Sequence, residues 1–224
     1  MRIVSYNLRK HSAVGELIDL AESHDVDVLC LQEADTTDLP QRVGHLVLAD
    51  ATQKNRLGLA IYLREDQYEV RATRMFSVHK SLHDRILAPA HERLLAAHLY
   101  DRKSGREVLV GDFHAAPLTA SNKLRRKQIA GAHDGMRSLA PHLPALMVGD
   151  FNYPWFISAL ERKLMVSGYT LTRSTEPTYV RYKFFSGYFD FVTSTGFTID
   201  RVDVLPPGAS DHRAISLKAH ITEL

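Results

Sequence analysis

The feature of this sequence that most constrains its fold is a set of short apolar segments separated by helical patterns. Arg2–Tyr6 and Val26–Leu31 have the length and apolar content of buried strands. Between them, Val14–Ser23 carries apolar residues at the three- and four-residue spacing of a helix. The chain therefore opens with a strand–helix–strand unit.

The middle of the chain has a different pattern, in which predicted strands follow one another through short connections. The four expected strands are Leu57–Leu63, Tyr68–Met75, Arg93–Tyr100 and Glu107–Gly111, with a hairpin turn at Arg102–Arg106. Helices are then expected at Ser121–Ala132 and Trp155–Val166, and strands at Ala145–Val148, Tyr188–Thr193 and Ala214–Ile221. Helix-and-strand units at both ends, with consecutive strands between them, predict a mixed α/β sandwich.

Length and composition bound the class of protein. The 224 residues are expected to form one domain, 1–224, because no linker, repeat or low-complexity segment divides them. A hydrophobic content of 45% with nearly balanced charge excludes a disordered chain. No apolar run reaches the roughly 20 residues that span a bilayer, no targeting segment follows Met1, and Cys30 is the single cysteine. We expect a soluble, cytoplasmic protein with no stable membrane association, and a monomer.

The net charge of +2 conceals an uneven distribution. Residues 1–50 carry 4 Lys/Arg and 9 Asp/Glu, whereas residues 101–137 carry 8 and 4. Arginine outnumbers lysine 19 to 9, and guanidinium groups bind phosphate through two hydrogen bonds. A genomic codon bias accounts equally well for the arginine excess. The composition therefore permits a nucleic-acid enzyme without showing one.

Polar side chains of a particular kind lie at the ends of the predicted buried strands. Because strand ends gather at one edge of an α/β sheet, these side chains are expected to converge. Carboxylates and amides there suit one or two hard divalent cations, and two histidines supply acid–base chemistry near neutral pH. Singly, each is also an ordinary turn or strand-end residue, and only the joint pattern indicates a site. The set is Asn7, Glu33, His114, Asp150, Asn152, Asp190, Asp211 and His212.

The order of five short motifs resembles the endonuclease/exonuclease/phosphatase superfamily. The motifs are SYN at 5–7, LQE at 31–33, GDFN at 149–152, FDFV at 189–192 and SDH at 210–212. The resemblance covers nearly the whole chain, from Asn7 to His212. It implies a four-layered α/β/β/α sandwich with two central mixed β-sheets and a metal-dependent phosphoester-cleaving site at one edge.

The resemblance also implies roles for individual residues. Glu33 matches the principal ligand of Mg²⁺ or Mn²⁺, with Asn7 and Asp211 beside it. Asp150 and Asn152 match the pair that positions the nucleophilic water, the phosphate and any second metal. His212 matches the catalytic histidine, and Asp190 matches the acid that orients it.

His114 distinguishes branches of the superfamily. His114, its expected partner Glu92, and the phosphate-contacting Arg9 resemble residues of the deoxyribonuclease I-like members. Asp35 stands where those members carry an arginine that enters the minor groove, and their disulfides are impossible here. The segment VGDFH at 110–114 is similar in sequence to VGDFN at 148–152. Its aspartate, Asp112, is expected to support His114.

Three further segments have two interpretations each. Cations of a helix after His114 either bind a phosphate backbone or form a solvated face, namely Lys123, Arg125, Arg126 and Lys127. Trp155 and Phe156 either stack on an unpaired base or pack as a helix staple or as part of the core. Arg181, Tyr182 and Lys183 form a second possible rim patch.

Three functions remain open from the sequence. The first is a divalent-metal-dependent phosphodiesterase that hydrolyses nucleic acid, with DNA favoured and an endonuclease-like action. The second is the same hydrolase acting on a phospholipid, an inositol phosphate or another small phosphoester, because one site serves all of these. The third is a noncatalytic binding protein that keeps the sandwich, and it is disfavoured because every polar site residue has a counterpart here.

Overall fold

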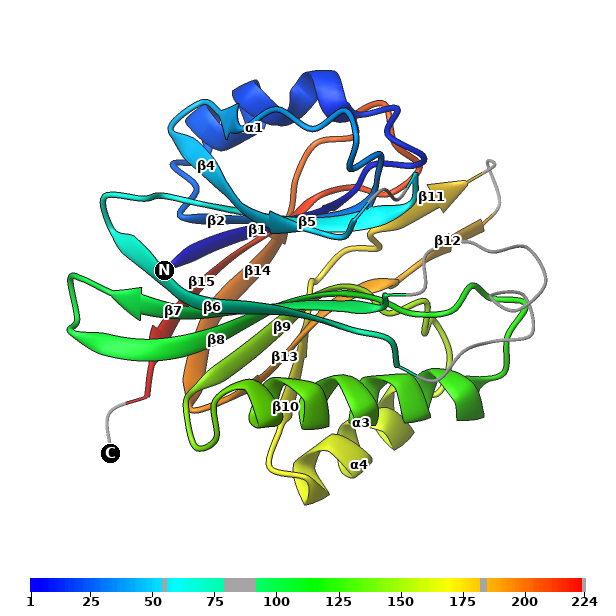
Figure 1. The fold of residues 1–224 in the computed structure, drawn as a ribbon. Coiled ribbons are helices and arrows are strands. Elements are labelled where there is room, and N and C mark those ends of the chain that lie inside the picture. The colour runs from blue at the N-terminus through cyan, green and yellow to red at the C-terminus, as the bar shows by residue number, and fades with distance from the viewer. Residues whose placement is uncertain (54–55, 79–91, 182–184, 223–224) are drawn as a thin grey trace.

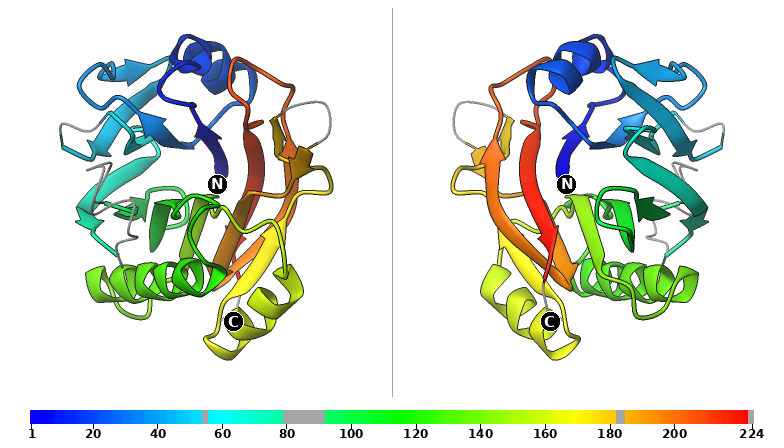
Figure 2. Two further views of the ribbon diagram at one scale, coloured as in Figure 1. Left: turned by 90° about the vertical axis from the view of Figure 1, so that its right-hand side faces the viewer. Right: turned by 90° about the vertical axis from the view of Figure 1, so that its left-hand side faces the viewer.

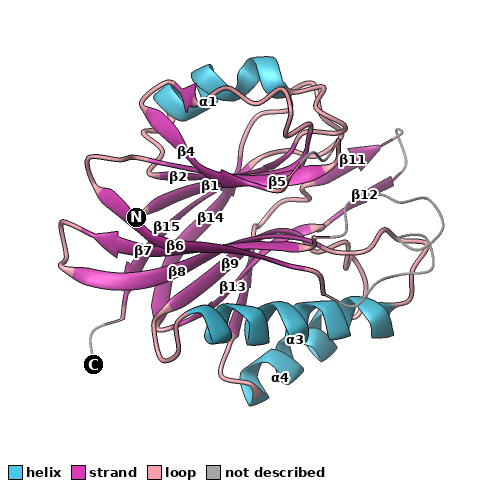
Figure 3. Cartoon of the chain, viewed as in Figure 1, coloured by secondary structure: helices cyan, strands magenta, loops and turns pink. Residues whose placement is uncertain are grey.

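The computed structural model describes residues 1–53, 56–78, 92–181 and 185–222. Two large β-sheets form the centre of the molecule (Figures 1 and 3). The first sheet contains β1 (Arg2–Asn7), β2 (Val28–Ala34), β3 (Arg42–Val43), β4 (Leu46–Ala51), β5 (Gly58–Leu63), β14 (Phe197–Val204) and β15 (Ile215–Ile221). The second contains β6 (Tyr68–Phe76), β7 (Leu94–Asp101), β8 (Arg106–His114), β9 (Ala145–Asp150), β10 (Thr170–Arg173) and β13 (Asp190–Thr195).

The strand orders show that each sheet is mixed. The first sheet has the order β14-β15-β1-β2-β5-β4-β3, and the second β10-β13-β9-β8-β7-β6. Only β1 with β2 and β8 with β9 are parallel among the described pairs of these two sheets. A small hairpin of β11 (Tyr179–Arg181) and β12 (Phe185–Gly187) stands beside them. Parallel neighbours bring Asn7 level with Gln32 and His114 level with Asp150, so four strands end at one edge.

Helices cover the outer faces of both sheets. The short helix η1 (Val14–Glu16) leads into α1 (Leu17–Ser23), which covers the first sheet, while α3 (Asn122–Leu139) and α4 (Ile157–Val166) cover the second (Figures 1 and 2). One apolar cluster fills the space between the two sheets. A second cluster lies between the second sheet and its helices, and a third lies between the first sheet and its helix. The expected four-layered α/β/β/α sandwich is therefore confirmed.

The boundaries differ from the sequence expectations where tertiary contacts decide them. α3 continues to Leu139 instead of ending at Ala132, because His133 and Met136 are buried against the second sheet. α4 begins at Ile157, two residues late, because Phe156 has a left-handed backbone with φ 63°. The strands β3, β4, β10, β11, β12 and β14 were not expected, since they are short or largely half-buried and lack a continuous apolar pattern. No helix in the described ranges is long and apolar enough to cross a membrane.

Candidate active site

The polar residues predicted from the strand ends meet at one edge of the sandwich. Asn7 closes β1, Glu33 lies near the end of β2, His114 closes β8 and Asp150 closes β9. The antiparallel strand β13 contributes its first residue, Asp190, directly opposite Asp150. His212 follows β14 and comes shortly before β15, the strand that pairs with β1. Both sheets therefore supply side chains to the same place.

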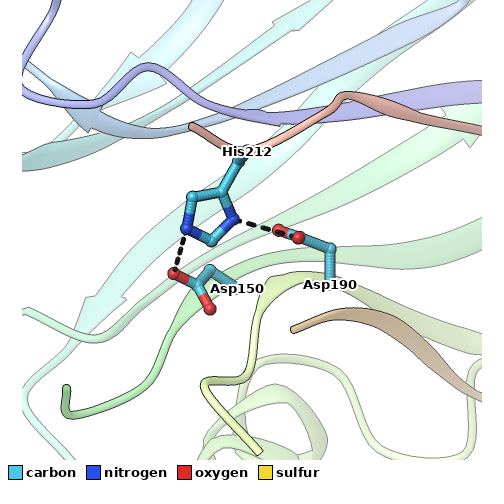
Figure 4. A group of neighbouring side chains, drawn as sticks. All are labelled: Asp150, Asp190 and His212. Carbon is cyan, nitrogen blue, oxygen red and sulfur yellow. Dashed lines mark hydrogen bonds and ion pairs between the residues drawn. The ribbon is translucent and has the colours of Figure 1, made fainter. Parts of the chain in front are cut away.

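A histidine between two carboxylates forms the floor of the site (Figure 4). Nδ1 of His212 lies 3.0 Å from Oδ2 of Asp190, and Nε2 of His212 lies 3.6 Å from Oδ2 of Asp150. All three side chains are buried. Each side chain offers one atom that could coordinate a metal ion, and these three atoms lie within 4.8 Å of one another. The ring of Tyr179 meets His212 edge-on, with 4.8 Å between ring centroids.

Burial and charge set the protonation states of these groups. Burial raises the pKa of Asp150, and the negative charges of Asp190 and Glu33 raise it further, while His212 opposes the shift. Burial alone would lower the pKa of His212, but the carboxylates of Asp190 and Asp150 outweigh it and raise that pKa. Burial, with the charges of Arg93 and His212, lowers the pKa of His114 well below its usual value. His212 is thus held protonated and His114 neutral.

Two asparagines and His114 surround the carboxylate of Asp150. Asn7 Nδ2 donates to Asp150 Oδ2 at 3.0 Å, and the Asn152 backbone N–H donates to Asp150 Oδ1 at 2.9 Å. Nε2 of His114 lies 3.7 Å from Asp150 Oδ2 and 4.0 Å from Glu33 Oε1. Polar groups from the ends of β1 and β8, and the backbone N–H of the residue just after β9, therefore surround the oxygens of Asp150.

The segment after β1 completes the other side of the site. The Lys10 backbone N–H donates to Glu33 Oε2 at 3.0 Å, and Arg9 Nε lies 3.8 Å from Asp211 Oδ2. Arg9, Lys10 and Glu33 all have left-handed backbones, with φ of 47°, 55° and 52°. Such conformations are uncommon outside glycine and cluster at functional sites.

A cavity of about 690 Å³ opens above these groups. The predicted residues in its wall are Arg9, Glu33, His114, Asp150, Asn152, Asp211 and His212. Lys10, Ser12, Tyr179, Phe189 and the segment 117–119 also line it and were missed. Phe189 belongs to the FDFV motif but was given no role, and the sequence carried no signal for Tyr179, because the distance of a strand residue from a distant loop is set only by the fold.

The supporting role of three residues was also not predicted from the sequence. Ser210 Oγ donates to the backbone oxygen of Asn7 at 2.7 Å and accepts from the His212 backbone N–H at 3.1 Å. Thr178 Oγ1 accepts from the Asp190 backbone N–H at 3.1 Å. Glu16 accepts from the Ala209 backbone N–H at 2.6 Å, which fixes the loop before Asp211. Asp112 is buried behind the site and accepts from Gln32 Nε2 at 2.6 Å.

The four cations of the segment 123–127 have two different kinds of surroundings. Arg125 is 2% exposed, and its guanidinium donates to the Pro117 backbone oxygen at 2.8 Å. Arg125, predicted to bind substrate, thus lies facing inward and fixes the loop after His114. Lys123, Arg126 and Lys127 instead line a groove of about 570 Å³ between α3 and α4.

Two other groups of predicted residues lie next to segments that the structure does not describe. Glu92 precedes Arg93, whose backbone accepts a hydrogen bond from the His114 N–H at 3.0 Å. Within the described ranges, no hydrogen bond or ion pair joins Glu92 to His114 itself. Arg181 ends β11, while Tyr182 and Lys183 lie outside the described residues.

Comparisons with known proteins agree with this architecture. The chain matches the crystal structure of an endonuclease/exonuclease/phosphatase family protein from Bacteroides thetaiotaomicron with a TM-score of 0.81 and 17% identity, covering 100% of this chain and 98% of that one. It matches the mannosyl-6-phosphatase Bt3783 of the same organism with a TM-score of 0.77 and 16% identity, covering 99% and 100%. D. rerio TDP2, complexed with a single-strand DNA product, matches with a TM-score of 0.77 and 14% identity over 98% of both chains.

Two facing sheets meet at a common edge that carries a histidine–aspartate pair and further carboxylates. The model of the Endonuclease/Exonuclease/phosphatase family matches residues 4–212. The chain belongs to this family, whose members are phosphoester hydrolases that generally depend on a divalent metal. No curated protein sequence matches the chain significantly.

Proposed function

We propose that this protein is a Mg²⁺- or Mn²⁺-dependent phosphodiesterase that hydrolyses nucleic acid, with DNA as the favoured substrate. The observation that carries the proposal is the buried His212, which lies between Asp190 and Asp150 and lines an open cavity. A phosphodiester that enters meets a cationic donor, a carboxylate and neutral amide donors together. This is the combination that in-line phosphoryl hydrolysis requires.

The donor set fits a hard divalent cation. The pKa of Asp150 is raised by burial next to two other carboxylates, an accumulation of negative charge that a cation neutralises. Oxygen ligands from carboxylates and an amide are those that Mg²⁺ and Mn²⁺ prefer. Glu33 and Asp211 would hold the metal, with Asn7 and Asp150 beside them. A metal bound there supplies Lewis-acid stabilisation of charge on the phosphate oxygens.

The protein's own residues divide the remaining chemistry. His212, protonated and oriented by Asp190, donates from Nε2 to a nonbridging phosphate oxygen. Asn7, Asn152 and His114 hydrogen-bond the phosphate and align it with the attacking water. Asp150 Oδ2 accepts the proton of that water, because burial raises the pKa of Asp150 above that of an exposed aspartate. The water oxygen bonds to phosphorus while the bond from phosphorus to the leaving oxygen breaks on the opposite side, and the leaving oxygen takes up a proton from solvent.

Charge around the cavity favours a polyanionic substrate over a small phosphoester. Arg9 and Lys10 line the cavity, and Lys123, Arg126 and Lys127 extend from the start of α3. Cations spread in this way match successive phosphates of a strand, with binding that weakens as salt releases counterions. A small phosphoester or a phospholipid headgroup remains the competing class, and the test includes both.

The test is a metal-dependent assay on supercoiled plasmid, single-stranded DNA and RNA, with phospholipid, inositol phosphate and sugar phosphate panels alongside. We expect plasmid nicking that EDTA abolishes and that Glu33→Ala and His212→Ala each reduce by several orders of magnitude. His220→Ala is the matched control, because Nδ1 of His220 lies 3.2 Å from Asp200 in an exposed histidine–aspartate pair on β15 and β14. Near-normal activity in His212→Ala would contradict the assigned site. Turnover of the small substrates alone would contradict the nucleic-acid assignment.

A further inference from the structure

Two aromatic side chains next to the active site face solvent. Trp155 is 50% exposed and Phe156 is 73% exposed. The interpretation that they pack as part of the core is therefore wrong. Most other aromatic side chains of the described chain are buried or half-buried, so this exposed pair calls for a ligand-based explanation.

The pair lies within reach of the reacting phosphate. Trp155 is three residues after Asn152, which lines the catalytic cavity and bonds to Asp150. Since a chain advances at most about 3.6 Å per residue, the Cα atoms of Asn152 and Trp155 lie within about 11 Å. That span corresponds to about three nucleotides at the 3.4 Å rise of one strand.

The local backbone holds the pair outward. Tyr153 is fully buried, and its hydroxyl accepts a hydrogen bond from Arg126 Nη1 at 2.8 Å. Phe156 has φ 63°, a conformation that bulky residues rarely adopt. Its backbone oxygen accepts from the N–H groups of Ala159 and Leu160, at 3.0 and 3.2 Å, so this strained residue is fixed at the start of α4. Strain of this kind, next to a site, is a mark of function.

Cations accompany the aromatic pair. Arg126 joins α3 to Tyr153, two residues before Trp155, and shares one groove with Lys123 and Lys127. Exposed aromatic faces and cations, linked here through the Arg126–Tyr153 hydrogen bond, are a combination suited to unpaired nucleic acid, since any base can stack while cations contact the backbone. A lipid surface would instead require a continuous apolar loop, and Trp155 and Phe156 are the only exposed apolar side chains within the described segment 151–160.

We propose that Trp155 and Phe156 form a stacking platform for an unpaired base within about three nucleotides of the scissile phosphate. The preferred substrate is accordingly a single strand or a frayed end rather than continuous duplex. This inference rests on the proposed function, because it assumes a nucleic-acid strand in the catalytic cavity.

The first test compares kcat and KM on a single-stranded oligonucleotide and on its duplex, using the full chain. Trp155→Ala is expected to raise KM on the single strand about 5- to 150-fold, the loss of one stacked base. Trp155→Phe, which keeps an aromatic face, should recover most of that loss. Phe156→Asn removes the ring while suiting the left-handed backbone, and Val166→Ala, at an exposed position at the end of α4, is the control.

The second test identifies stacking directly. Single abasic nucleotides are placed at successive positions of the oligonucleotide. The wild-type protein should lose affinity at one or two positions near the cleaved bond, and the Trp155→Ala/Phe156→Asn variant should not respond to them. Equal KM on single strand and duplex, with no abasic effect in an active wild-type protein, would overturn the platform alone. Wild-type protein that cleaves no nucleic acid would instead overturn the proposed function, and vesicle binding that requires Trp155 would reassign the pair to a membrane.

Discussion

Nδ1 of His212 lies 3.0 Å from Oδ2 of Asp190, and both side chains are buried. Asp190 begins β13 of the second sheet and His212 lies in the connection between β14 and β15 of the first, so the contact joins the layers at the site. An ionised carboxylate accepts from Nδ1–H and thereby directs Nε2 toward the cavity and Asp150.

Asp190→Asn tests this pair, because asparagine keeps the shape but removes the charge. The pKa of His212 should fall, since the charge of Asp190 is the largest influence raising it. We expect kcat to fall about 10²- to 10⁴-fold, as in other histidine–aspartate pairs, with little change in KM. The pKa of His212 is to be followed by NMR titration in the metal-free protein. Unchanged kcat together with an unchanged histidine titration would contradict the assigned role.

Glu33→Gln is expected to weaken metal binding while preserving the fold. A glutamine has the size of glutamate but lacks the charge that a hard cation requires. Calorimetric titration with Mn²⁺ should show at least a tenfold loss of affinity, and the melting temperature should change little. Glu161→Gln, on α4, serves as the control. Wild-type Mn²⁺ affinity in Glu33→Gln would remove Glu33 from the metal site.

Glu16 is expected to act on the site from a distance. Its carboxylate accepts from the Ala209 N–H and from the Tyr6 hydroxyl, at 2.6 and 2.9 Å. Glu16→Ala should lower the free energy of unfolding by about 1–3 kcal/mol and reduce kcat by freeing the loop before Asp211. Glu65→Ala removes only an exposed ion pair with Arg42 and should cost less than about 1 kcal/mol. Equal effects of the two substitutions in denaturant unfolding and kcat would argue against a fixed loop.

Gly149 is required by the packing of β8 against β9. It has φ 145°, and a Cβ there would lie 1.9 Å from the Phe113 backbone oxygen. Gly149→Ala should therefore destabilise the protein by about 2–5 kcal/mol and displace Asp150. Gly15→Ala, which meets nothing within 4 Å, should be neutral or slightly stabilising. Urea unfolding compares the two, and similar free energies would show that the close contact is relieved by small shifts.

His133 is expected to make stability depend on pH. It is buried on α3, bonds to Thr193 Oγ1 at 2.9 Å and stacks on Tyr169. Burial, with a contribution from Arg137, lowers its pKa from 6.5 to about 3. The unfolded chain therefore binds the extra proton between these values, so stability falls as pH drops below about 6.5, by up to about 1.4 kcal/mol per pH unit.

The measurement is the free energy of unfolding at pH 7.5, 6 and 5. His133→Phe/Thr193→Val keeps the stacked ring and removes both hydrogen-bonding groups. Its stability should fall less steeply with acid than that of the wild-type protein, because the other histidines titrate in both. Parallel pH profiles would show that His133 is not responsible.

Residue type and position alone predicted most of the site. Glu33, Asp150 and His212 stand at or next to the ends of short apolar strands. The ends of neighbouring strands gather at one edge of a sheet, so these side chains are expected to meet there. The helices and central strands were predicted for the same reason, since their apolar periodicity is local. Strands such as β4 and β14 were missed, because a half-buried strand at or next to the edge of a sheet is defined by its neighbours rather than by its own pattern.

The sequence by itself thus determined the class of fold, the family and the polar residues available at one edge. Only the tertiary structure decided which of two adjacent residues faces inward. Arg125 and Arg126 are neighbours in sequence, but a helix turns about 100° per residue, so one is buried and the other lines a groove. Trp155 and Phe156 look like core residues in the sequence. The left-handed turn before α4 leaves them exposed, because burial depends on what packs against a side chain and not on its hydrophobicity.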